Sequence, residues 1–445
     1  MKFPAFLRHP ARLVTVAFGL VVIVGTLLLM LPASRTGDSP ADVMVASFTT
    51  VSAVCVTGLI TVDTASYWTP FGQVIILVLI HIGGLGVMAM ATLLTLTVRG
   101  RLGLRSTMVA QAETHTMALG DVRRVLLRVV VMMAIIESVV AVVLVLRFKM
   151  GYDQPWSEAL WNGIFHSGSG FNNAGFALFS DGLIGFVGDP FIILPICVAV
   201  ILGGIGFPVL RELRHRWRRP ASWTLHTRIT VWGSVVLLAV GSFLFWAFEA
   251  TSGGTLDGMG ASGQIFGSFA GGVFPRTAGF NSVDYEVIKD ETEAITIGLM
   301  LIGGGSAGTA GGIKVGTFVI LGFVIWSEIR GEQDVTFRSR RISDAVQRQA
   351  LTVALLALAL VSVSIVSMMA VTDLPAIDIS FEVVSAFATV GLSTGITADL
   401  PPTGQIILMA LMFIGRVGSI TVASAIALNT RHRHYRLPEE RPIVG

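Results

Sequence analysis

Uncharged apolar runs about as long as a membrane is thick recur along the whole chain. The first covers residues 13–32 (LVTVAFGLVVIVGTLLLMLP). About 20 apolar residues let a helix cross a hydrocarbon core of roughly 30 Å. Only 13% of the 445 residues are charged, against roughly 25% in a typical soluble domain. The pattern predicts a multi-pass membrane protein, and the length of the first run predicts a retained helix rather than a cleaved signal peptide.

Basic residues concentrate in three segments between the apolar runs, near residues 98–124, 211–228 and 330–348. Short loops rich in Lys and Arg stay in the cytoplasm, so these segments and both termini are predicted to lie inside. The alternate segments carry most of the acids and are predicted to lie outside, with Arg147 and Lys149 as the main exceptions. Because each basic segment lies between apolar spans, topology explains the charge better than nucleic-acid binding does. No nucleic-acid partner is predicted.

Four shorter segments, each ending near a glycine, align without gaps. They read SFTTVSAVCVTGL (47–59), IFHSGSGFNNAGF (164–176), SFAGGVFPRTAGF (268–280) and SFEVVSAFATVGL (380–392). Each has a phenylalanine ten positions before a glycine and a large apolar residue directly after it. The glycines are Gly58, Gly175, Gly279 and Gly391, at spacings of 117, 104 and 112 residues. A fixed offset that recurs four times in register predicts four copies of one unit.

The predicted fold is an all-α membrane protein with eight transmembrane helices and four re-entrant pore helices. They form four tandem helix–pore loop–helix repeats around one central pore. Cutting at the basic segments gives the four parts 1–97 (repeat 1 with the N-terminal tail), 98–210 (cytoplasmic loop and repeat 2), 211–327 (cytoplasmic loop and repeat 3) and 328–445 (cytoplasmic loop, repeat 4 and C-terminal tail).

The glycine-ending segments suit the conduction of a cation. Their irregular ends cannot face lipid with unpaired backbone groups, so they must be buried in protein or line water. Glycine accepts φ > 0, which lets successive carbonyl oxygens point toward one axis. Four such strands can replace the hydration shell of an ion with carbonyl oxygens, as in K⁺ filters. The C-terminal ends of the short helices add partial negative charge toward the ion.

A second glycine motif follows each of these glycines by 24 to 28 residues, beginning at Gly83, Gly203, Gly303 and Gly415. For most of these glycines, close packing of membrane helices is a sufficient explanation. Residues 303–314 (GGGSAGTAGGIK) are different. Each glycine costs about 1 kcal/mol relative to alanine inside a helix, so this helix is predicted to break. The break is either a gate or an inert kink.

These motifs resemble the Trk/Ktr/HKT superfamily of K⁺ transporters, especially the bacterial Ktr membrane subunits, over nearly the whole chain. The most specific motifs are VCVTGL (54–59), FNNAGF (171–176), RTAGFN (276–281), ATVGLS (388–393), GGGSAGTAGGIK (303–314) and GRVGS (415–419). The resemblance implies K⁺ uptake across a prokaryotic cytoplasmic membrane and a mobile intramembrane gating loop. It also implies that the four glycines hold K⁺ by backbone carbonyls, and glycine rather than serine at the first favours K⁺ over Na⁺.

The candidate site residues follow from these strands and this loop. The filter candidates are Val54, Cys55, Val56, Thr57, Gly58, Asn172, Asn173, Ala174, Gly175, Arg276, Thr277, Ala278, Gly279, Ala388, Thr389, Val390 and Gly391. The gating candidates are Gly303, Gly304, Gly305, Ser306, Gly308, Gly311, Gly312, Lys314 and Arg416.

Charges inside a membrane protein are functional candidates. Arg416 replaces a small residue of the other three repeats and is predicted to act as a barrier or anchor near the conduction path. Lys314 is predicted to help set the closed loop, and purely structural pairing is the alternative for both. Glu382 is a candidate partner of Arg416, Glu137 has no assigned role, and His81 is expected to be a packed residue.

The resemblance further implies a homodimer that binds a separate cytoplasmic ring of nucleotide-binding regulatory subunits. No cofactor is predicted in this chain, K⁺ is its substrate, and any nucleotide belongs to the partner. The basic segments and the tail RHRHYR (431–436) are candidate docking surfaces. Anionic membrane lipid is the alternative ligand of these bases.

Two other functions remain open. A less selective Na⁺/K⁺ pathway is possible because the four strands differ in sequence. Residues 304–308 match G-x-S-x-G, and a G-x-G-x-x-G pattern overlaps them, but neither has the strand context that its motif requires. An intramembrane serine hydrolase built on Ser306, or on Ser169 with His166, is the alternative from a different class.

Overall fold

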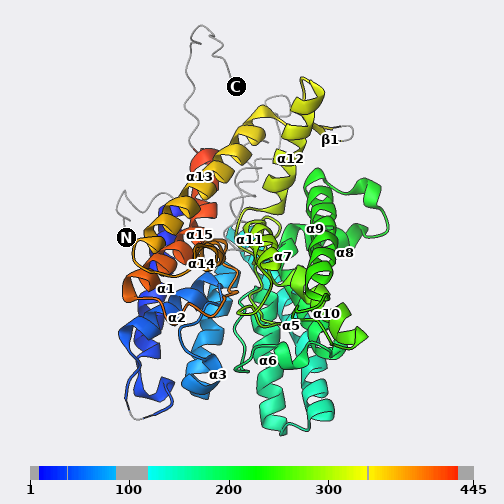
Figure 1. Cartoon of the computed structure of the whole chain (residues 1–445). Helices are drawn as coiled ribbons and strands as arrows, with labels where there is room; N and C mark the ends of the chain where they lie inside the picture. The colour runs from blue at the N-terminus through cyan, green and yellow to red at the C-terminus, as the bar shows by residue number, and fades with distance from the viewer. Residues whose placement is uncertain (1–9, 38, 87–118, 338–339, 429–445) are drawn as a thin grey trace.

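The structure is a computed structural model, and it is almost entirely helical (Figure 1). It describes residues 10–37, 39–86, 119–337 and 340–428. The basic residues of 98–118 and the tail 431–436, both predicted docking surfaces, lie outside the described residues.

The helices follow the order expected for four similar units. The first unit holds α1 (Pro10–Leu29), η2 (Pro32–Ser34), α2 (Val43–Cys55), α3 (Thr64–Tyr67) and a helix over Pro70–Gly86. The second holds α5 (Leu119–Tyr152), α6 (Trp156–Asn172), η3 (Ile184–Phe186), α7 (Pro190–Ile205), α8 (Phe207–Arg216) and η4 (Pro220–Ser222). The third holds α9 (Leu225–Glu249), α10 (Ala261–Val273), α11 (Asp290–Leu301) and α12 (Val315–Arg330). The fourth holds α13 (Asp344–Met369), α14 (Ala376–Ala388) and α15 (Pro402–Leu428).

A two-stranded antiparallel hairpin is the one sheet in the described residues. Its strands are β1 (Thr336–Phe337) and β2 (Arg340–Arg341), with Thr336 opposite Arg341 and Phe337 opposite Arg340. The hairpin follows α12 at the end of the molecule that is at the top of Figure 1, whereas α3 lies at the opposite end.

Several helices are long and apolar enough to cross a membrane. Among the described residues these are Leu126–Tyr152, α9 and α13, and the pair α7 and α8 makes a fourth if it is counted as one bent span. Four shorter apolar helices cover Thr15–Leu29, Val43–Cys55, Pro70–Gly86 and Pro402–Gly418. These lengths support the predicted helical membrane protein, while the count of eight spans stays a prediction.

The outer and inner helices differ in the side chains that they expose. Large apolar side chains on the long helices α5, α9 and α13, such as Val139, Phe243 and Val363, are each more than 60% exposed. Such a surface is unfavourable in water and suits contact with lipid. The short helix α2 is enclosed instead, and Phe48 and Ser52 are both completely buried. The long helices therefore surround the short ones, as α5 packs on α6 and α9 on α10.

A sharp bend separates α7 from α8. The two helices meet at 104°, with Gly206 between them at φ 99° and ψ 144°. The sequence predicted a break only in the third repeat, so this break was missed. Close packing does explain Gly203, since a Cβ there would collide with the carbonyl oxygen of Phe171.

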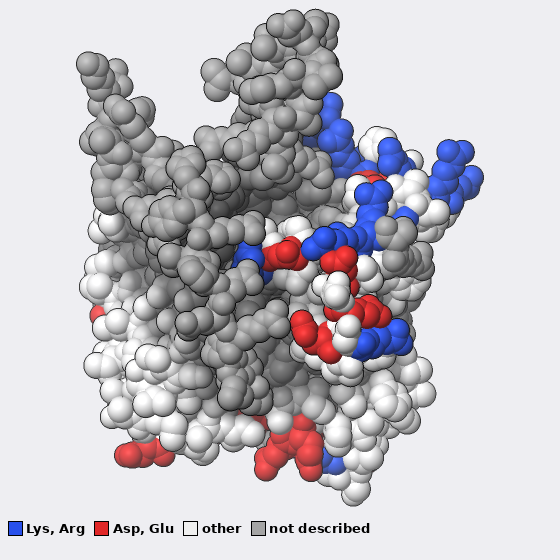
Figure 2. Space-filling model, turned by 90° about the horizontal axis from the view of Figure 1, so that it is seen from above, with Lys and Arg blue, Asp and Glu red and all other residues white. Residues whose placement is uncertain are grey.

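Basic side chains gather at the end of the molecule viewed in Figure 2, on one side of the part that the structure describes. There α8 contributes Arg214 and Arg216 in its last turn. The loop after α8 is held by Glu212, which accepts a hydrogen bond from the Thr224 hydroxyl at 2.7 Å and another from Thr227. Burial raises the pKa of Glu212, but these hydrogen bonds outweigh it and leave the pKa below its usual value. Glu212 therefore stays charged and fixes the basic α8 against α9.

Candidate ion-conducting site

Each filter segment begins where a short buried helix ends. The helices α2, α6 and α14 end three residues before Gly58, Gly175 and Gly391, and α10 ends six residues before Gly279. The backbone then turns left-handed at Val56, Asn173, Thr277 and Thr389, with φ between 52° and 70°. Such a φ costs about 1–3 kcal/mol for a residue with a side chain and is concentrated at functional sites. The same strained turn in all four units points to a shared site.

The four predicted glycines form a closed ring. All have positive φ, from 71° at Gly279 to 100° at Gly391. A Cβ built on each glycine would come within 2.9 to 3.1 Å of the Cα of the next, in the order Gly58, Gly175, Gly279, Gly391 and back to Gly58. It would also collide with the carbonyl oxygen just before that neighbouring glycine. The order along the chain is therefore the order around one axis, and only glycine fits this close approach.

Pore-helix serines hold three of the filter strands. Ser52 and Ser385 accept hydrogen bonds from the backbone N–H groups of Gly58 and Gly391, at 3.0 and 3.1 Å. At the same position of the second unit, Ser169 donates to the Phe176 carbonyl oxygen at 2.7 Å. The third unit has Val273 there, and its Gly279 N–H binds the Phe274 carbonyl oxygen at 3.3 Å instead. The ring is thus only approximately fourfold.

A cavity of about 290 Å³ opens on one side of the ring, and all four glycines line it. Asp63, Asp284 and Glu286 lie in its wall. Asp63 accepts hydrogen bonds from the Ser66 and Ser180 hydroxyls, at 2.6 and 2.8 Å. Burial raises the pKa of Asp63, but these bonds and two backbone N–H groups outweigh it and leave the pKa below its usual value. The wall therefore carries a fixed negative charge that attracts cations to the ring.

The predicted break in the third unit is present. The helix α11 ends at Leu301 and α12 begins at Val315, with residues 302–314 forming a loop between them. The Gly303 N–H donates to the Ile313 carbonyl oxygen at 2.9 Å, and the Ile313 N–H donates to the Leu301 carbonyl oxygen at 3.1 Å. These bonds close the neck of the segment 303–314, which we call the glycine loop.

The glycine loop contacts the filter at its pore-helix end, away from the cavity. The Thr309 hydroxyl donates to Asn173 Oδ1 at 2.8 Å, and the Thr309 N–H binds the Gly203 carbonyl oxygen at 3.1 Å. On the far side of the loop, a Cβ on Gly311 would collide with Thr389. The loop therefore lies between the second and fourth filter strands.

Arg416, which is buried, and Lys314, which is partly buried, both donate hydrogen bonds to the glycine loop. Arg416 on α15 is 2% exposed, and its guanidinium donates to the Thr309 carbonyl oxygen and, at 3.5 Å, to that of Gly83. Lys314 Nζ donates to the carbonyl oxygens of Ala310 and Gly311 in its own loop. Arg416 thus ties the loop to the first unit, whereas Lys314 folds the loop onto itself.

The expected pairing of Glu382 with Arg416 was wrong. Glu382 accepts hydrogen bonds from the Ser393 and Thr397 hydroxyls, which follow the filter glycine on the cavity side. Arg416 binds the glycine loop at the opposite end of the filter. The position of Glu382 on its pore helix did not show whether its partner lies at the cavity end of the filter or at the end near the glycine loop.

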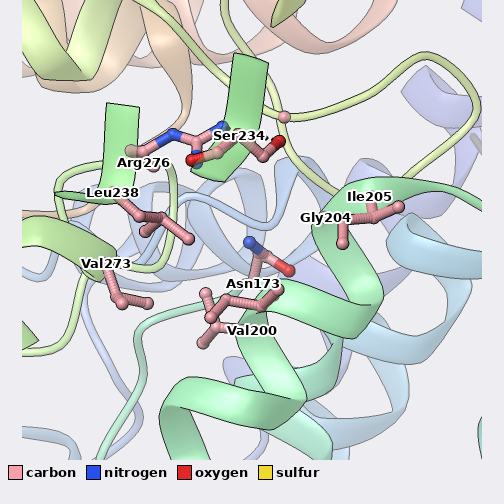
Figure 3. A pocket seen from close by; sticks show the side chains of 10 residues that line it. Asn173, Val200, Gly204, Ile205, Ser234, Leu238, Val273 and Arg276 are labelled. Carbon is pink, nitrogen blue, oxygen red and sulfur yellow. Dashed lines mark hydrogen bonds between the residues drawn. The ribbon is translucent and has the colours of Figure 1, made fainter. Parts of the chain in front are cut away.

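Arg276 lies behind the third filter strand. Its guanidinium donates to the carbonyl oxygens of Ser234 on α9, at 3.3 Å, and of Gly303, at 3.2 Å. Figure 3 shows it beside Ser234 in a small pocket that Asn173 and Gly204 also line. The sequence predicts Arg276 as a residue of the third filter strand, and its side chain joins the back of that strand to the first residue of the glycine loop.

The role of Glu137, left open by the sequence, is to hold Asn172. Its carboxylate lies 3.1 Å from His81 Nε2 and accepts a hydrogen bond from Asn172 Nδ2, also at 3.1 Å. His81 is therefore an ion-pairing residue rather than a simply packed one, and Asn172 turns its side chain toward α5 instead of the axis. A lone acid in an apolar helix signals a partner but does not identify it.

A ring of glycines with a cavity at one end and a buried loop at the other, enclosed by apolar helices, defines a membrane cation-transport protein. The chain belongs to the TrkH family of cation transport proteins, which it matches over residues 4–432.

Three relatives match almost end to end. The chain is 37% identical to the Ktr system potassium uptake protein B of Bacillus subtilis, over 98% of this chain and 97% of that one. It is 35% identical to the protein of the same name from Vibrio alginolyticus, over 98% of this chain and 94% of that one. It is 33% identical to the potassium/sodium uptake protein NtpJ of Enterococcus hirae, over 98% and 97%.

The fold matches the crystal structure of the potassium transporter TrkH from Vibrio parahaemolyticus, with a TM-score of 0.72 and 15% identity, over 97% of this chain and 87% of that one. Because the family and these relatives are transporters, the chain is not an enzyme, and the serine hydrolase alternative is set aside. His166 and Ser169 instead bind backbone groups of the second filter strand.

Proposed function

We propose that this chain takes up K⁺ through one central pore, in which the carbonyl oxygens that precede Gly58, Gly175, Gly279 and Gly391 replace the hydration shell of the ion. The closed ring of these glycines is the observation that carries the proposal. The names of the relatives support K⁺ as the substrate. The pore-helix C-termini add negative potential at the ring, and Asp63 adds charge at its mouth.

The glycine loop is the gate in this proposal. It lies against the filter at the end away from the cavity and is held by Arg416. Displacing it breaks the hydrogen bonds from Thr309 to Asn173 and to Gly203. The four parts 1–97, 98–210, 211–327 and 328–445 each supply one strand of the pore, in a chain that spans a prokaryotic cytoplasmic membrane eight times with both ends inside.

Ion flux into liposomes that contain the purified chain tests the proposal. With K⁺, Rb⁺ or Na⁺ as the only permeant cation, K⁺ and Rb⁺ are expected to enter much faster than Na⁺, because the oxygen ring matches the larger ions. Protein-free liposomes are the control. Equal K⁺ and Na⁺ rates contradict K⁺ selectivity and favour the second candidate, a Na⁺/K⁺ pathway. Two observations favour that candidate: the third filter strand lacks the pore-helix serine of the other three units, and the Enterococcus relative is named a potassium/sodium uptake protein.

A cytoplasmic partner accompanies the proposed transport. The chain forms a homodimer that binds a ring of nucleotide-binding subunits at the basic end seen in Figure 2. Charge reversal at the exposed Arg214, in the last turn of α8, and at Arg218, two residues past its end, is expected to reduce co-purification with that subunit, because it removes positive charge from the docking surface. The same reversal at Arg35, a partly exposed base beside α3 at the opposite end, is the control for a change of charge elsewhere. Undiminished co-purification of the α8 variant, in lipid without anionic headgroups, contradicts this docking surface.

A further inference from the structure

One position of the pore helices carries an ionisable residue in two of the four units and not in the other two. It lies nine residues before each filter glycine, and its residues are Thr49, His166, Ala270 and Glu382. All four belong to the buried short helices α2, α6, α10 and α14. Only the second and fourth units place an ionisable side chain there, and both side chains are completely buried.

His166 joins its pore helix to the strand that leaves the filter. Its Nδ1 lies 2.7 Å from the Asn162 carbonyl oxygen, and its Nε2 lies 3.2 Å from the backbone N of Leu178, three residues past Gly175. A carbonyl oxygen only accepts and an N–H only donates, so Nδ1 carries the proton and Nε2 accepts. The ring also stacks on Phe179, with centroids 4.9 Å apart. The imidazole is therefore a fixed link between helix and strand.

Glu382 makes the equivalent link in the fourth unit. Its carboxylate accepts hydrogen bonds from the Ser393 hydroxyl and, at 3.0 Å, from that of Thr397. Ser393 is two residues past Gly391, and its hydroxyl oxygen also accepts the Gly395 N–H at 3.0 Å. A different chemical group thus ties the same pore-helix position to the strand that leaves the filter of its own unit.

The other two units lack this link. Thr49 Oγ1 makes no hydrogen bond within the described residues, and Ala270 has no polar side-chain atom. The third strand is instead held from outside its own unit, where the Asn281 carbonyl oxygen accepts the Leu183 N–H at 2.7 Å. In the ring each glycine touches the next in chain order, so the second and fourth strands face each other across the axis.

We propose that His166 and Glu382 are a diagonal pair of positioning residues that set the ion selectivity of the filter. Each fixes the outgoing strand of its unit to its pore helix, which limits how far two opposite sets of carbonyl oxygens can move toward the axis. Filter oxygens that are free to move inward can surround a smaller ion, so loss of either link favours Na⁺. This inference rests on the proposed K⁺ pathway and assigns its selectivity to two residues that do not contact the ion.

The test compares K⁺ and Na⁺ flux in liposomes for full-length variants. His166→Phe keeps a ring of similar size but loses both nitrogens, and Glu382→Met keeps the length but loses both oxygens. Each is expected to lower the K⁺/Na⁺ flux ratio by about tenfold, the size expected for one lost buried hydrogen-bonded link. Total cation flux is retained. Glu382→Gln, which keeps one acceptor, is expected to recover part of the ratio.

Matched controls separate this role from general damage to the pore helices. Thr49→Val changes the same position in the first unit, where no link exists, and is expected to leave the ratio unchanged. Ser393→Ala removes a partner of Glu382 from the strand and leaves the pore helix intact, so it is expected to lower the ratio even if Glu382→Met does not fold. If Glu382→Met is not monodisperse in detergent, Ser393→Ala is used in its place.

The outcomes distinguish this inference from the proposed function. If the unaltered chain shows equal K⁺ and Na⁺ flux, the proposed K⁺ pathway fails. If the unaltered chain is selective but His166→Phe and Ser393→Ala keep its ratio, the diagonal pair is overturned while the K⁺ pathway stands. An equal loss of selectivity in Thr49→Val also overturns the diagonal pair, because selectivity would then depend on this pore-helix position and not on a hydrogen bond from it to the strand.

Discussion

Replacing Gly391 by alanine is expected to abolish most K⁺ flux. Gly391 has φ 100°, and a Cβ there would lie 3.0 Å from the Gly58 Cα and collide with the Thr57 carbonyl oxygen. The left-handed backbone alone costs a residue with a side chain about 1–2 kcal/mol, and the collision adds to that cost. Both the fourth and the first strand must then shift, so flux is expected to fall by more than about tenfold.

Gly322→Ala is the matched control for this change. Gly322 lies within α12, and a Cβ there would meet nothing within 4 Å. Alanine is favoured over glycine in a helix by about 1 kcal/mol, so this variant is expected to keep full flux. Liposome K⁺ uptake by both variants, normalised to reconstituted protein, gives the comparison. Normal selective flux through Gly391→Ala is incompatible with a filter at this ring.

Removing Arg416 is expected to raise K⁺ flux without changing selectivity. Its guanidinium holds the glycine loop by the Thr309 carbonyl oxygen and joins it to Gly83 in the first unit. Hydrogen bonds to a charged group contribute about 1.5–3 kcal/mol each, so Arg416→Ala shifts the loop toward its displaced position by about tenfold or more. The measurement is K⁺ flux of the isolated chain in the absence of any partner.

Arg330→Ala controls for the loss of a positive charge. Its side chain is 58% exposed at the end of α12, and its neighbour Glu332 is 3.8 Å away. An exposed pair of this kind contributes little, so flux is expected to stay at its original level. If Arg416→Ala folds and its flux is unchanged or lower, Arg416 does not hold the gate closed.

The two variants act at opposite sides of the same structure. Gly391→Ala changes the ring in which the ion is held, and Arg416→Ala changes the loop that lies against that ring. Selectivity and flux are therefore expected to separate, with the first variant losing flux and the second gaining it at unchanged K⁺/Na⁺ ratio. A loss of selectivity in Arg416→Ala shows that the loop also shapes the filter, through its contact with Asn173.

The amino-acid sequence determined the repeated features of this protein. The ten-residue offset from Phe48 to Gly58, and its three copies, predicted the short helices and the ring glycines because each depends on a local stretch of chain. The break at residues 303–314 was predictable for the same reason, since glycine content acts within one helix. The family resemblance added the roles expected for the loop and for Arg416.

Only the tertiary structure decided which residues meet. Arg416 binds Thr309, 107 positions away, and Gly83, 333 positions away. Glu137 binds Asn172 and His81, and Glu382 binds Ser393 rather than Arg416. A buried polar group needs a hydrogen-bond partner, and the sequence predicts that need. Several groups can meet it, so the sequence does not identify the partner. Which one does so depends on how four similar units close around one axis, and no single unit contains that information.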